Sequence, residues 1–387
     1  MLKTIDECFF QIQNGVNIKQ GNVAGGFPIT RIETIANNMF NRDKMGYAGI
    51  TDISKYKSYV LEDGDLLMSH INSAQYLGRT VLYIKRENET IIHGMNLLRL
   101  KARRDIINPA YARYCFYGHI FKSQISNITK KSVNQASFAV KDLKQIRIDV
   151  PTLSEQVRVV EILDKVQGII ELRKKELYKL DNLIKARFVE LFGDPILNSR
   201  GLPESTLPQL GEFGRGVSKY RPRNDPKLLG GEYPLIQTGD VAAADLYITN
   251  YNNTYSEIGL KQSKMWDKGT LCITIAANIA KTAILDFDAC FPDSVVGFQA
   301  NDKTNNIFIH YWFSFFQEIL EAQAPESAQK NINLKVLSEL KVIIPNKVEQ
   351  EKFANFVNQV NKSKLKVEES LKKLETLQKS LMQQYFG

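Results

Sequence analysis

Residues 135–156 read QASFAVKDLKQIRIDVPTLSEQ, and residues 329–350 read QKNINLKVLSELKVIIPNKVEQ. The two stretches keep Gln, Lys, Leu, Pro and Glu-Gln at the same spacing, 194 positions apart. The similarity runs without a gap from 132–193 to 326–387, with fourteen identities in 62 positions, and both copies finish on Phe-Gly. A period this long exceeds that of repeat solenoids. It predicts two copies of a domain-plus-helix unit, related by pseudo-two-fold symmetry.

Each copy continues into one long amphipathic helix, at 152–191 and from 346 onward. Thr152 and Glu155 have capping-box spacing just after Pro151, and Pro345 precedes the second helix in the same way. Apolar residues then recur every seven positions, which is typical of a coiled-coil seam. The predicted seam consists of Leu163, Ile170, Leu177, Ile184 and Leu191 in one copy and Phe353, Val360, Val367, Leu374 and Leu381 in the other. We predict an intramolecular antiparallel coiled coil of roughly 60 Å, the alternative being two ordinary packing helices.

The segment before each helix is rich in short β-like runs. Gly64 and Gly269 each precede an apolar run, as turn glycines that open buried strands do. The sequence therefore predicts an α+β fold of four segments: a domain at 1–150, a helix at 151–195, a second domain at 196–345 and a second helix at 346–387. The domains should consist of mixed strands and short helices.

Basic residues are unevenly distributed. The net charge is +9, and residues 1–150 carry 21 basic and 13 acidic side chains, whereas residues 196–345 carry 14 and 16. Arg215, Lys219, Arg221 and Arg223 nevertheless lie close together in the second domain without an acid between them. Such clusters can contact phosphates locally, and duplex DNA suits a protein with two similar halves. Solvated surface lysines alone explain many such excesses.

Motifs that would indicate catalysis are missing from the sequence. There is no phosphate-binding loop, no nucleophile elbow, no dinucleotide fingerprint and no histidine pair at metal-ligand spacing. Asn108-Pro109-Ala110-Tyr111 resembles the loop with which amino-methyltransferases hold a base, but a helix N-cap followed by proline explains it fully. The four cysteines are expected to be reduced core residues. Neither a leader nor a bilayer-length apolar run is found, so we expect a cytoplasmic protein that does not contact membranes.

The duplicated Gln…Leu…Pro…Glu-Gln segments, the Gly64-Asp65-Leu66-Leu67 turn and the Phe-Gly helix ends resemble the specificity (S) subunit of type I restriction-modification systems. The resemblance covers essentially the whole chain. It implies two target recognition domains that each read one half of a split, asymmetric DNA site, and two helices that set the gap between the half-sites. It also implies a chain without catalytic residues.

The same resemblance implies partners and cofactors. Double-stranded DNA is the ligand, two methyltransferase (M) subunits dock on the chain, and restriction (R) subunits join them. S-adenosylmethionine belongs to the M subunits, and ATP and Mg belong to the R subunits. This chain is therefore expected to bind no cofactor or metal itself.

Candidate contact residues are polar or basic side chains in loops at the ends of predicted strands. They are of the types that reach base edges or phosphates. For DNA these are Arg31, Lys55, Lys57, Ser69, Asn72, Arg79, Ser218, Lys219, Arg221, Arg223, Gln237, Thr238, Asp240, Asn278 and Lys281. For partner subunits they are Glu155, Gln156, Glu349 and Gln350, together with the exposed faces of the helices. Each could instead be a solvated loop residue or, for the glutamates, half of a capping box.

Two other functions remain open from sequence alone. The chain could be a methyltransferase or nuclease with a divergent active site, which would bind S-adenosylmethionine or turn over substrate by itself. It could also be a coiled-coil adaptor without sequence specificity, which would bind DNA indifferently or not at all.

Overall fold

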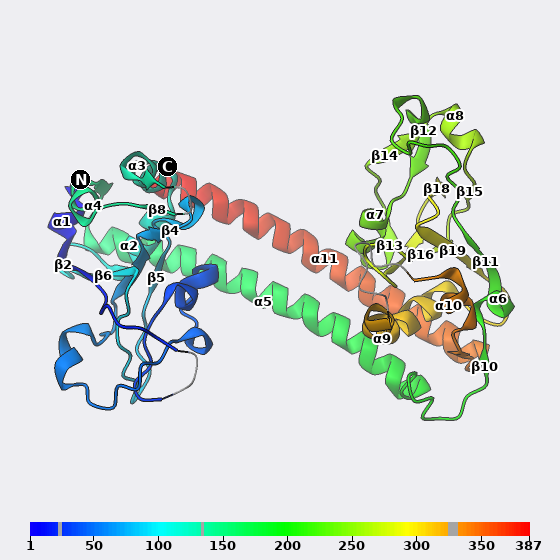
Figure 1. The fold of residues 1–387 in the computed structure, drawn as a ribbon, viewed down its shortest axis with the longest axis horizontal. Helices are drawn as coiled ribbons and strands as arrows, with labels where there is room; N and C mark the ends of the chain where they lie inside the picture. The colour runs from blue at the N-terminus through cyan, green and yellow to red at the C-terminus, as the bar shows by residue number, and fades with distance from the viewer. Residues whose placement is uncertain (22–24, 133–134, 324–331) are drawn as a thin grey trace. The chain divides into compact units, whose positions relative to one another are not determined.

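The computed structural model of the chain describes residues 1–21, 25–132, 135–323 and 332–387. These residues form two compact units. Unit 1 comprises Met1–Lys174 and Glu369–Gly387, and unit 2 comprises Lys175–Glu368. Helices α5 (Leu153–Phe192) and α11 (Lys347–Phe386) each contribute one half to each unit (Figure 1). Gln329 of the repeated motif lies outside the described residues.

Unit 1 is built on a four-stranded antiparallel sheet in the order β2-β6-β3-β5. The other elements are short helices and two small antiparallel sheets, β1-β9 and β4-β8-β7. The strands are β1 (Leu2–Thr4), β2 (Phe9–Asn14), β3 (Leu66–Ser69), β4 (Ile71–Asn72), β5 (Thr80–Leu82), β6 (Leu97–Ala102), β7 (Lys130–Lys131), β8 (Ala136–Ser137) and β9 (Arg147–Asp149). The α-helices are α1 (Ile5–Cys8), α2 (Pro109–Tyr117), α3 (His119–Ile128) and α4 (Val140–Gln145).

Unit 2 contains a five-stranded sheet, β11-β19-β16-β17-β13, and a four-stranded sheet, β14-β12-β18-β15. The strands are β10 (Glu204–Ser205), β11 (Gly211–Arg215), β12 (Leu229–Leu235), β13 (Tyr247–Ile248), β14 (Asn253–Tyr255), β15 (Met265–Trp266), β16 (Leu271–Thr274), β17 (Thr282–Leu285), β18 (Ala289–Cys290), β19 (Val295–Ala300) and β20 (Val342–Ile343). The helices are α6 (Leu207–Leu210), α7 (Thr238–Ala243), α8 (Glu257–Lys261), α9 (Asn306–Gln323) and α10 (Leu334–Glu339).

The units repeat one plan. In each, a turn glycine in the left-handed region, Gly64 at φ +87° and Gly269 at φ +90°, leads into a fully buried central strand, β3 or β16. In each, the strand before the long helix pairs antiparallel with a strand near the start of the unit. The predicted α+β class, with two domains of mixed strands and short helices and two long antiparallel helices, is confirmed.

The long helices pack against each other within both units. In unit 1, Gln378 Nε2 donates to Gln167 Oε1 at 2.7 Å, and Lys174 lies 3.1 Å from Glu375. In unit 2, the Lys364 side chain reaches Asp181. Within each unit the two helices run antiparallel. Every predicted seam residue is buried or half-buried, and Leu163, Ile170, Ile184, Phe353, Val360 and Val367 are the buried ones.

The first turns of these helices follow their capping sequences. Thr152 Oγ1 donates to Glu155 Oε2 at 2.7 Å, and the Glu155 N–H donates back to Thr152 Oγ1. In the second copy the Val348 N–H donates to Asn346 Oδ1. Asn108 caps α2, because its Oδ1 accepts from the Ala110 N–H at 2.8 Å, with Pro109 in the first turn. The interpretation of this Asn-Pro-Ala-Tyr stretch as a helix N-cap followed by proline is therefore confirmed.

Candidate nucleic-acid interface

The basic loop of unit 2 is organised around one carboxylate. Arg221 and Arg223 both form ion pairs with Asp293, the first at 3.5 Å. Arg221 Nη1 also donates to the backbone carbonyls of Ser218 at 2.6 Å and Tyr220 at 2.9 Å. Lys219 is exposed, whereas Ser218 is buried. The guanidinium groups are thus held in place, and Ser218 is inaccessible as a direct contact.

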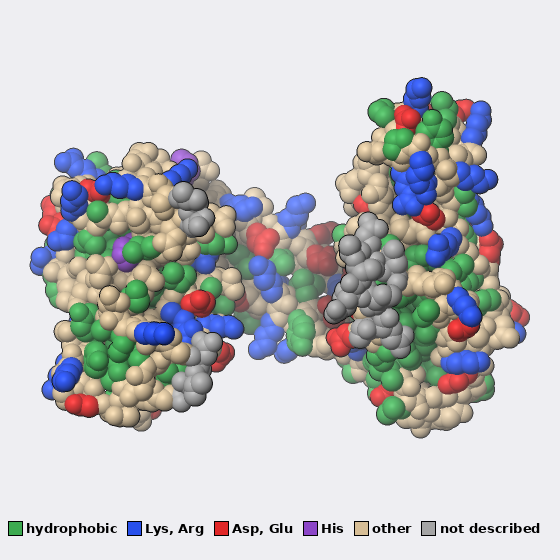
Figure 2. Space-filling view, in the orientation of Figure 1, with side chains coloured by type: hydrophobic (Ala, Val, Ile, Leu, Met, Phe, Trp, Pro, Cys, Tyr) green, Lys and Arg blue, Asp and Glu red, His purple; other side chains and the backbone are tan. Residues whose placement is uncertain are grey.

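A hollow of about 420 Å³ in unit 2 brings three predicted residues together. Arg223, Gln237 and Thr238 line it, together with Asn253 and Ser294 among others. Guanidinium, amide and hydroxyl groups are those that recognise base edges and phosphates. On the face seen in Figure 2, Lys and Arg side chains gather where Figure 1 labels β12, β14 and α8.

Asp240 does not line this hollow but binds the backbone of Gln237, which does. Its Oδ2 accepts from the Gln237 N–H at 2.8 Å, and its Oδ1 accepts from Asn252 Nδ2 at 2.9 Å. Both oxygens of the Asp240 carboxylate therefore accept hydrogen bonds from the protein itself, and the carboxylate caps α7. Asn278 and Lys281 lie in a separate turn after β16, where Thr274 Oγ1 donates to the Asn278 carbonyl, and neither lines the hollow.

In unit 1 the residues predicted to contact DNA lie in three separate regions. Arg31 lines a hollow of about 270 Å³ with Glu33 and Asn96, and its Nη2 donates to the carbonyls of Gly21 at 2.9 Å and Met45 at 2.8 Å. It therefore joins loop segments as well as facing the hollow. Lys55 and Lys57 are exposed on the 3-10 helix Ser54–Tyr59.

Buried Arg99 holds the segment that carries these two lysines. Its Nη1 donates to the Val60 carbonyl at 2.8 Å, and its Nη2 donates to the Ser58 carbonyl at 2.7 Å. The Arg99 side chain is 2% exposed and lies 4.0 Å from Asp65. Burial lowers the pKa of Arg99 and raises the pKa of Asp65 from their ordinary values. Sequence reasoning missed Arg99, because an arginine inside an alternating strand gives no sign of which carbonyls it binds.

The third place is the turn between β3 and β5. Ser69 is buried, and its Oγ accepts from Asn72 Nδ2 at 3.4 Å. Asn72 Oδ1 accepts from the Ser73 N–H at 2.7 Å, and the Arg79 guanidinium lies 4.5 Å from the centre of the Tyr76 ring. Asn72 and Arg79 are half-buried and keep part of their surface in solvent, whereas Ser69 does not.

The predicted docking residues divide into two kinds. Gln156 is buried, donates to the carbonyls of Ile106 and Pro151 at 3.0 and 2.9 Å, and accepts from the Asn108 N–H at 2.7 Å. Gln350 is also buried and donates to the carbonyls of Lys303 and Pro345. The repeated glutamines are thus bound inside their own units. Of the four named docking residues, only Glu155 and Glu349 are exposed, and the Glu155 carboxylate also completes the capping box with Thr152.

Replacing Gln156 by leucine should lower the free energy of unfolding by about 2–3 kcal/mol, since two carbonyls and one N–H lose their partner in a buried position. Chemical denaturation followed by circular dichroism measures the change. Ser154→Ala, at an exposed position of the same turn, should stay within about 0.5 kcal/mol. Equal effects of the two substitutions would contradict the structural role of Gln156.

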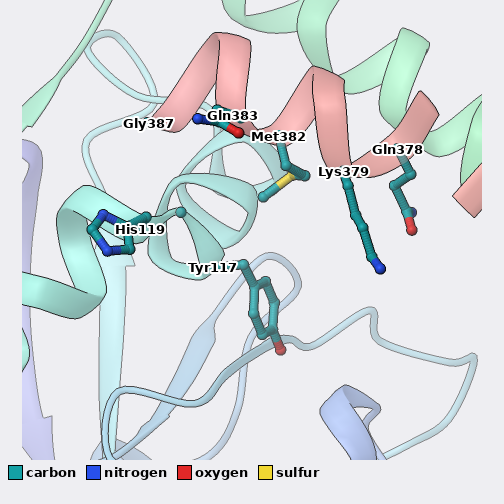
Figure 3. Close-up of a pocket in the computed structure, with 8 residues that line it drawn as sticks. Tyr117, His119, Gln378, Lys379, Met382, Gln383 and Gly387 are labelled. Carbon is teal, nitrogen blue, oxygen red and sulfur yellow. The ribbon is translucent and has the colours of Figure 1, made fainter. Parts of the chain in front are cut away.

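A hollow of about 470 Å³ lies in unit 1 between the start of α3 and the last turns of α11. Figure 3 shows Lys379 and Met382 extending from α11 toward the side where Tyr117 and His119 lie. The Tyr117 hydroxyl donates to the Thr80 carbonyl at 2.6 Å. The labelled side chains that line it are basic, polar or apolar, and none is acidic.

All four cysteines are buried, and so is His93. Burial raises the pKa of Cys8 to about 11 and that of Cys115 to about 12, and it lowers the pKa of His93 to about 3. A thiol with such a pKa is protonated at neutral pH and is a poor nucleophile. Within the described ranges, no three His, Cys, Asp or Glu side chains converge as a metal site would require. None of the described helices has the length and hydropathy needed to span a bilayer.

Comparisons with known proteins agree on one group. The family model described as "Type I restriction modification DNA specificity domain" matches residues 4–182 and again 204–378. A Methanocaldococcus jannaschii protein, provisionally named the type I restriction enzyme MjaX specificity subunit, is 27% identical over 383 residues, covering 95% of this chain and 89% of the relative. The EcoKI specificity subunit of Escherichia coli K12 is 22% identical over 187 residues, 47% of this chain and 40% of that protein.

Solved structures show the same fold. The crystal structure of the type I S subunit from M. genitalium superposes with a TM-score of 0.62 at 14% identity, over 100% of this chain and 96% of that one. A chain from a structure on complex assembly and conformational transition of the type I restriction-modification system gives 0.57 at 16% identity, over 100% and 97%.

Proposed function

The chain belongs to the type I restriction-modification DNA specificity family and is a specificity subunit, and from that premise we propose how its parts divide the work. Residues 1–150 and 196–345 each read one half of a split, asymmetric duplex site. The helices at 151–195 and 346–387 set the separation of the half-sites and dock the partner subunits. One observation carries the proposal: the family match occurs twice, and most of each copy lies in one unit with its own sheet, turn glycine and polar hollow.

The partners supply the chemistry in this proposal. Two methyltransferase subunits bring S-adenosylmethionine, and restriction subunits bring ATP and Mg. Burial keeps the thiols of Cys8 and Cys115 protonated and therefore poor nucleophiles, which supports assigning catalysis elsewhere. Exposed aliphatic side chains on the long helices, such as Leu172 at 66% and Leu365 at 60% exposure, offer apolar area for docking.

The site residues divide accordingly. In unit 2 we propose that Arg223, Gln237 and Thr238 contact DNA from the hollow, with Lys219 and Arg221 on phosphates, and that Asp240 orients Gln237. In unit 1 we propose the exposed lysines Lys55 and Lys57 and the half-buried Asn72 and Arg79. The buried Ser69 and Ser218 act only by shaping their loops.

The test is the methylation motif that the chain directs. Adenine methylation mapped genome-wide in cells with and without the chain should give a two-part motif that is present only with it. Exchanging residues 196–345 for the equivalent segment of a relative should change one half of this motif and leave the other half and the gap unchanged. A conservative control, exchange of Ser199 and Arg200 in the linker alone, should change neither half.

Three results would overturn the proposal. A motif that changes in both halves would show that the domains do not read independently. A chain that transfers methyl groups from S-adenosylmethionine without a partner would be an enzyme itself. Binding that does not distinguish the mapped duplex from a scrambled one would leave an adaptor without specificity.

A further inference from the structure

Two stretches of unit 1 contain no acidic residue. Residues 66–86 include Arg79, Lys85 and Arg86 but neither Asp nor Glu, and residues 106–141 include five Lys or Arg and again no acid. The equivalent region of unit 2 differs, because α9 carries Glu318 and Glu321 and the turn after β16 contributes only Lys281. The excess positive charge of unit 1 is thus concentrated in two parts of its sequence.

The fold brings these two stretches together. Strand β8 lies between β4 and β7, so that Asn72 pairs with Ala136 and Ala136 with Lys131. A Cβ atom on Gly78 would lie 3.3 Å from Ile125, which shows that the 76–79 turn packs on α3. Arg79 from the first stretch and Lys122, Lys130 and Lys131 from the second therefore belong to one local surface, here called the basic edge.

The cations of the basic edge keep their charge available. Lys130 and Lys131 are exposed, and no ion pair among the described residues involves any of the four basic-edge cations. Arg79 lies over the Tyr76 ring at 4.5 Å, and Lys122 lies 5.7 Å from the centre of the Tyr117 ring. An aromatic face positions a cation without neutralising it.

The basic loop of unit 2 is different in this respect. Arg221 and Arg223 share the Asp293 carboxylate, which offsets part of their charge. Residues 196–345 as a whole carry more acidic than basic side chains. An anionic backbone is therefore attracted more strongly to unit 1 than to unit 2, whatever bases each unit reads.

We infer that the basic edge is the main grip of this chain on the sugar-phosphate backbone of duplex DNA, so that unit 1 supplies most of the electrostatic affinity while unit 2 contributes mainly sequence selection. The inference rests on the proposed function. Cations combined with the side-chain amide of Asn72 and the hydroxyl of Ser73 are the usual groups that contact phosphates and fix register. None of Lys122, Lys130 and Lys131 was among the residues expected from sequence to contact DNA.

The experiment measures binding of the full chain to a duplex carrying the mapped motif over a series of salt concentrations. Each phosphate contact adds about 0.9 to the slope of log affinity against log salt. Lys130→Gln with Lys131→Gln should therefore reduce the slope by about 1.8 and weaken binding roughly tenfold or more near physiological salt. The loss should be equal for the motif and for a duplex with the first half-site scrambled, because backbone contacts carry no sequence information.

A matched control removes the same charge from unit 2. Lys268 and Lys335 pair with Asp286 and Glu339, and Lys268→Gln with Lys335→Gln should change the slope by less than about 0.5. Arg79→Gln provides a second variant at another element of the basic edge and should reduce the slope by about 0.9. Reduced slopes in both basic-edge variants support the inference.

The outcomes separate this inference from the proposed function. Specific binding with a wild-type slope in the Lys130/Lys131 variant overturns the inference and leaves the function standing. The inference is also overturned if the control variant loses as much slope as the basic-edge variant. Failure of the unmodified chain to distinguish motif from scrambled duplex instead overturns the function.

Discussion

Phe188→Ala should lower the free energy of unfolding by about 3–5 kcal/mol, the range for a fully buried aromatic residue. Phe188 lies on α5 within unit 2 and has no exposed surface. Its ring centre lies 5.3 Å from that of Phe308 on α9 and 5.4 Å from that of Phe353 on α11. Removing the ring leaves a cavity where three helices meet, and Phe308 and Phe353 lose their contacts with it.

Urea denaturation followed by circular dichroism measures this loss. Val189→Ala is the matched control, since it also shortens an apolar side chain on α5, at the next position, but one that is 41% exposed. It should cost less than about 1 kcal/mol. A Phe188 variant no less stable than the control would show that the aromatic cluster does not hold α5, α9 and α11 together.

The second large effect concerns a buried lysine on α11. Lys364 on α11 is 6% exposed, and its Nζ lies 2.5 Å from carboxylate oxygens of both Asp181 on α5 and Asp245 in the loop before β13. Burial alone lowers the pKa of Lys364, but the hydrogen bonds to the two carboxylates outweigh it and leave that pKa above its ordinary value. The lysine thus connects both long helices to the recognition domain of unit 2.

Asp181→Asn combined with Asp245→Asn should destabilise the protein by about 3 kcal/mol, because it leaves a buried ammonium without a counter-charge. Lys364→Met should cost less, about 1 kcal/mol, since both aspartates are half-exposed and remain hydrated. Denaturant unfolding of the two variants measures the difference. The opposite order would show that the carboxylates, not the lysine, carry the desolvation cost.

The same network has a pH dependence of defined sign. A lysine whose folded pKa lies above its unfolded value contributes stability fully below the unfolded pKa and loses it as pH rises through the folded pKa. The stability difference between wild type and Lys364→Met should therefore be constant through neutral pH. It should shrink only in the alkaline range, at and above the ordinary lysine pKa of about 10.4.

The long helices could be predicted because periodicity is a local signal. Apolar residues every seven positions and a capping box define Leu153–Phe192 without reference to the rest of the chain. The partners of individual side chains could not be predicted in this way. Asp293 is 70 residues from Arg223, and Asp181 is 183 residues from Lys364. No short-range pattern records such a pairing.

The polar character of a residue also did not reveal whether its side chain is buried or exposed. Ser69, Ser218 and Gln156 fit a loop contact by composition, yet all three are buried. Two adjacent lysines such as Lys130 and Lys131 usually mark a solvated surface, so the sequence alone gives no reason to select them. Only the pairing of β7 with β8 and of β8 with β4 brings them beside Asn72.

Unit 2 is continuous in the chain, whereas unit 1 takes in residues 369–387 as well as 1–174. Phe386 is buried in the core of unit 1, with its ring centre 5.3 Å from that of Tyr111. During synthesis on the ribosome, the last residue of unit 2 is therefore made before the last segment of unit 1. The half that is made first can complete its core only after Phe386 has been made, so loss of residues 369–387 would damage unit 1 rather than unit 2.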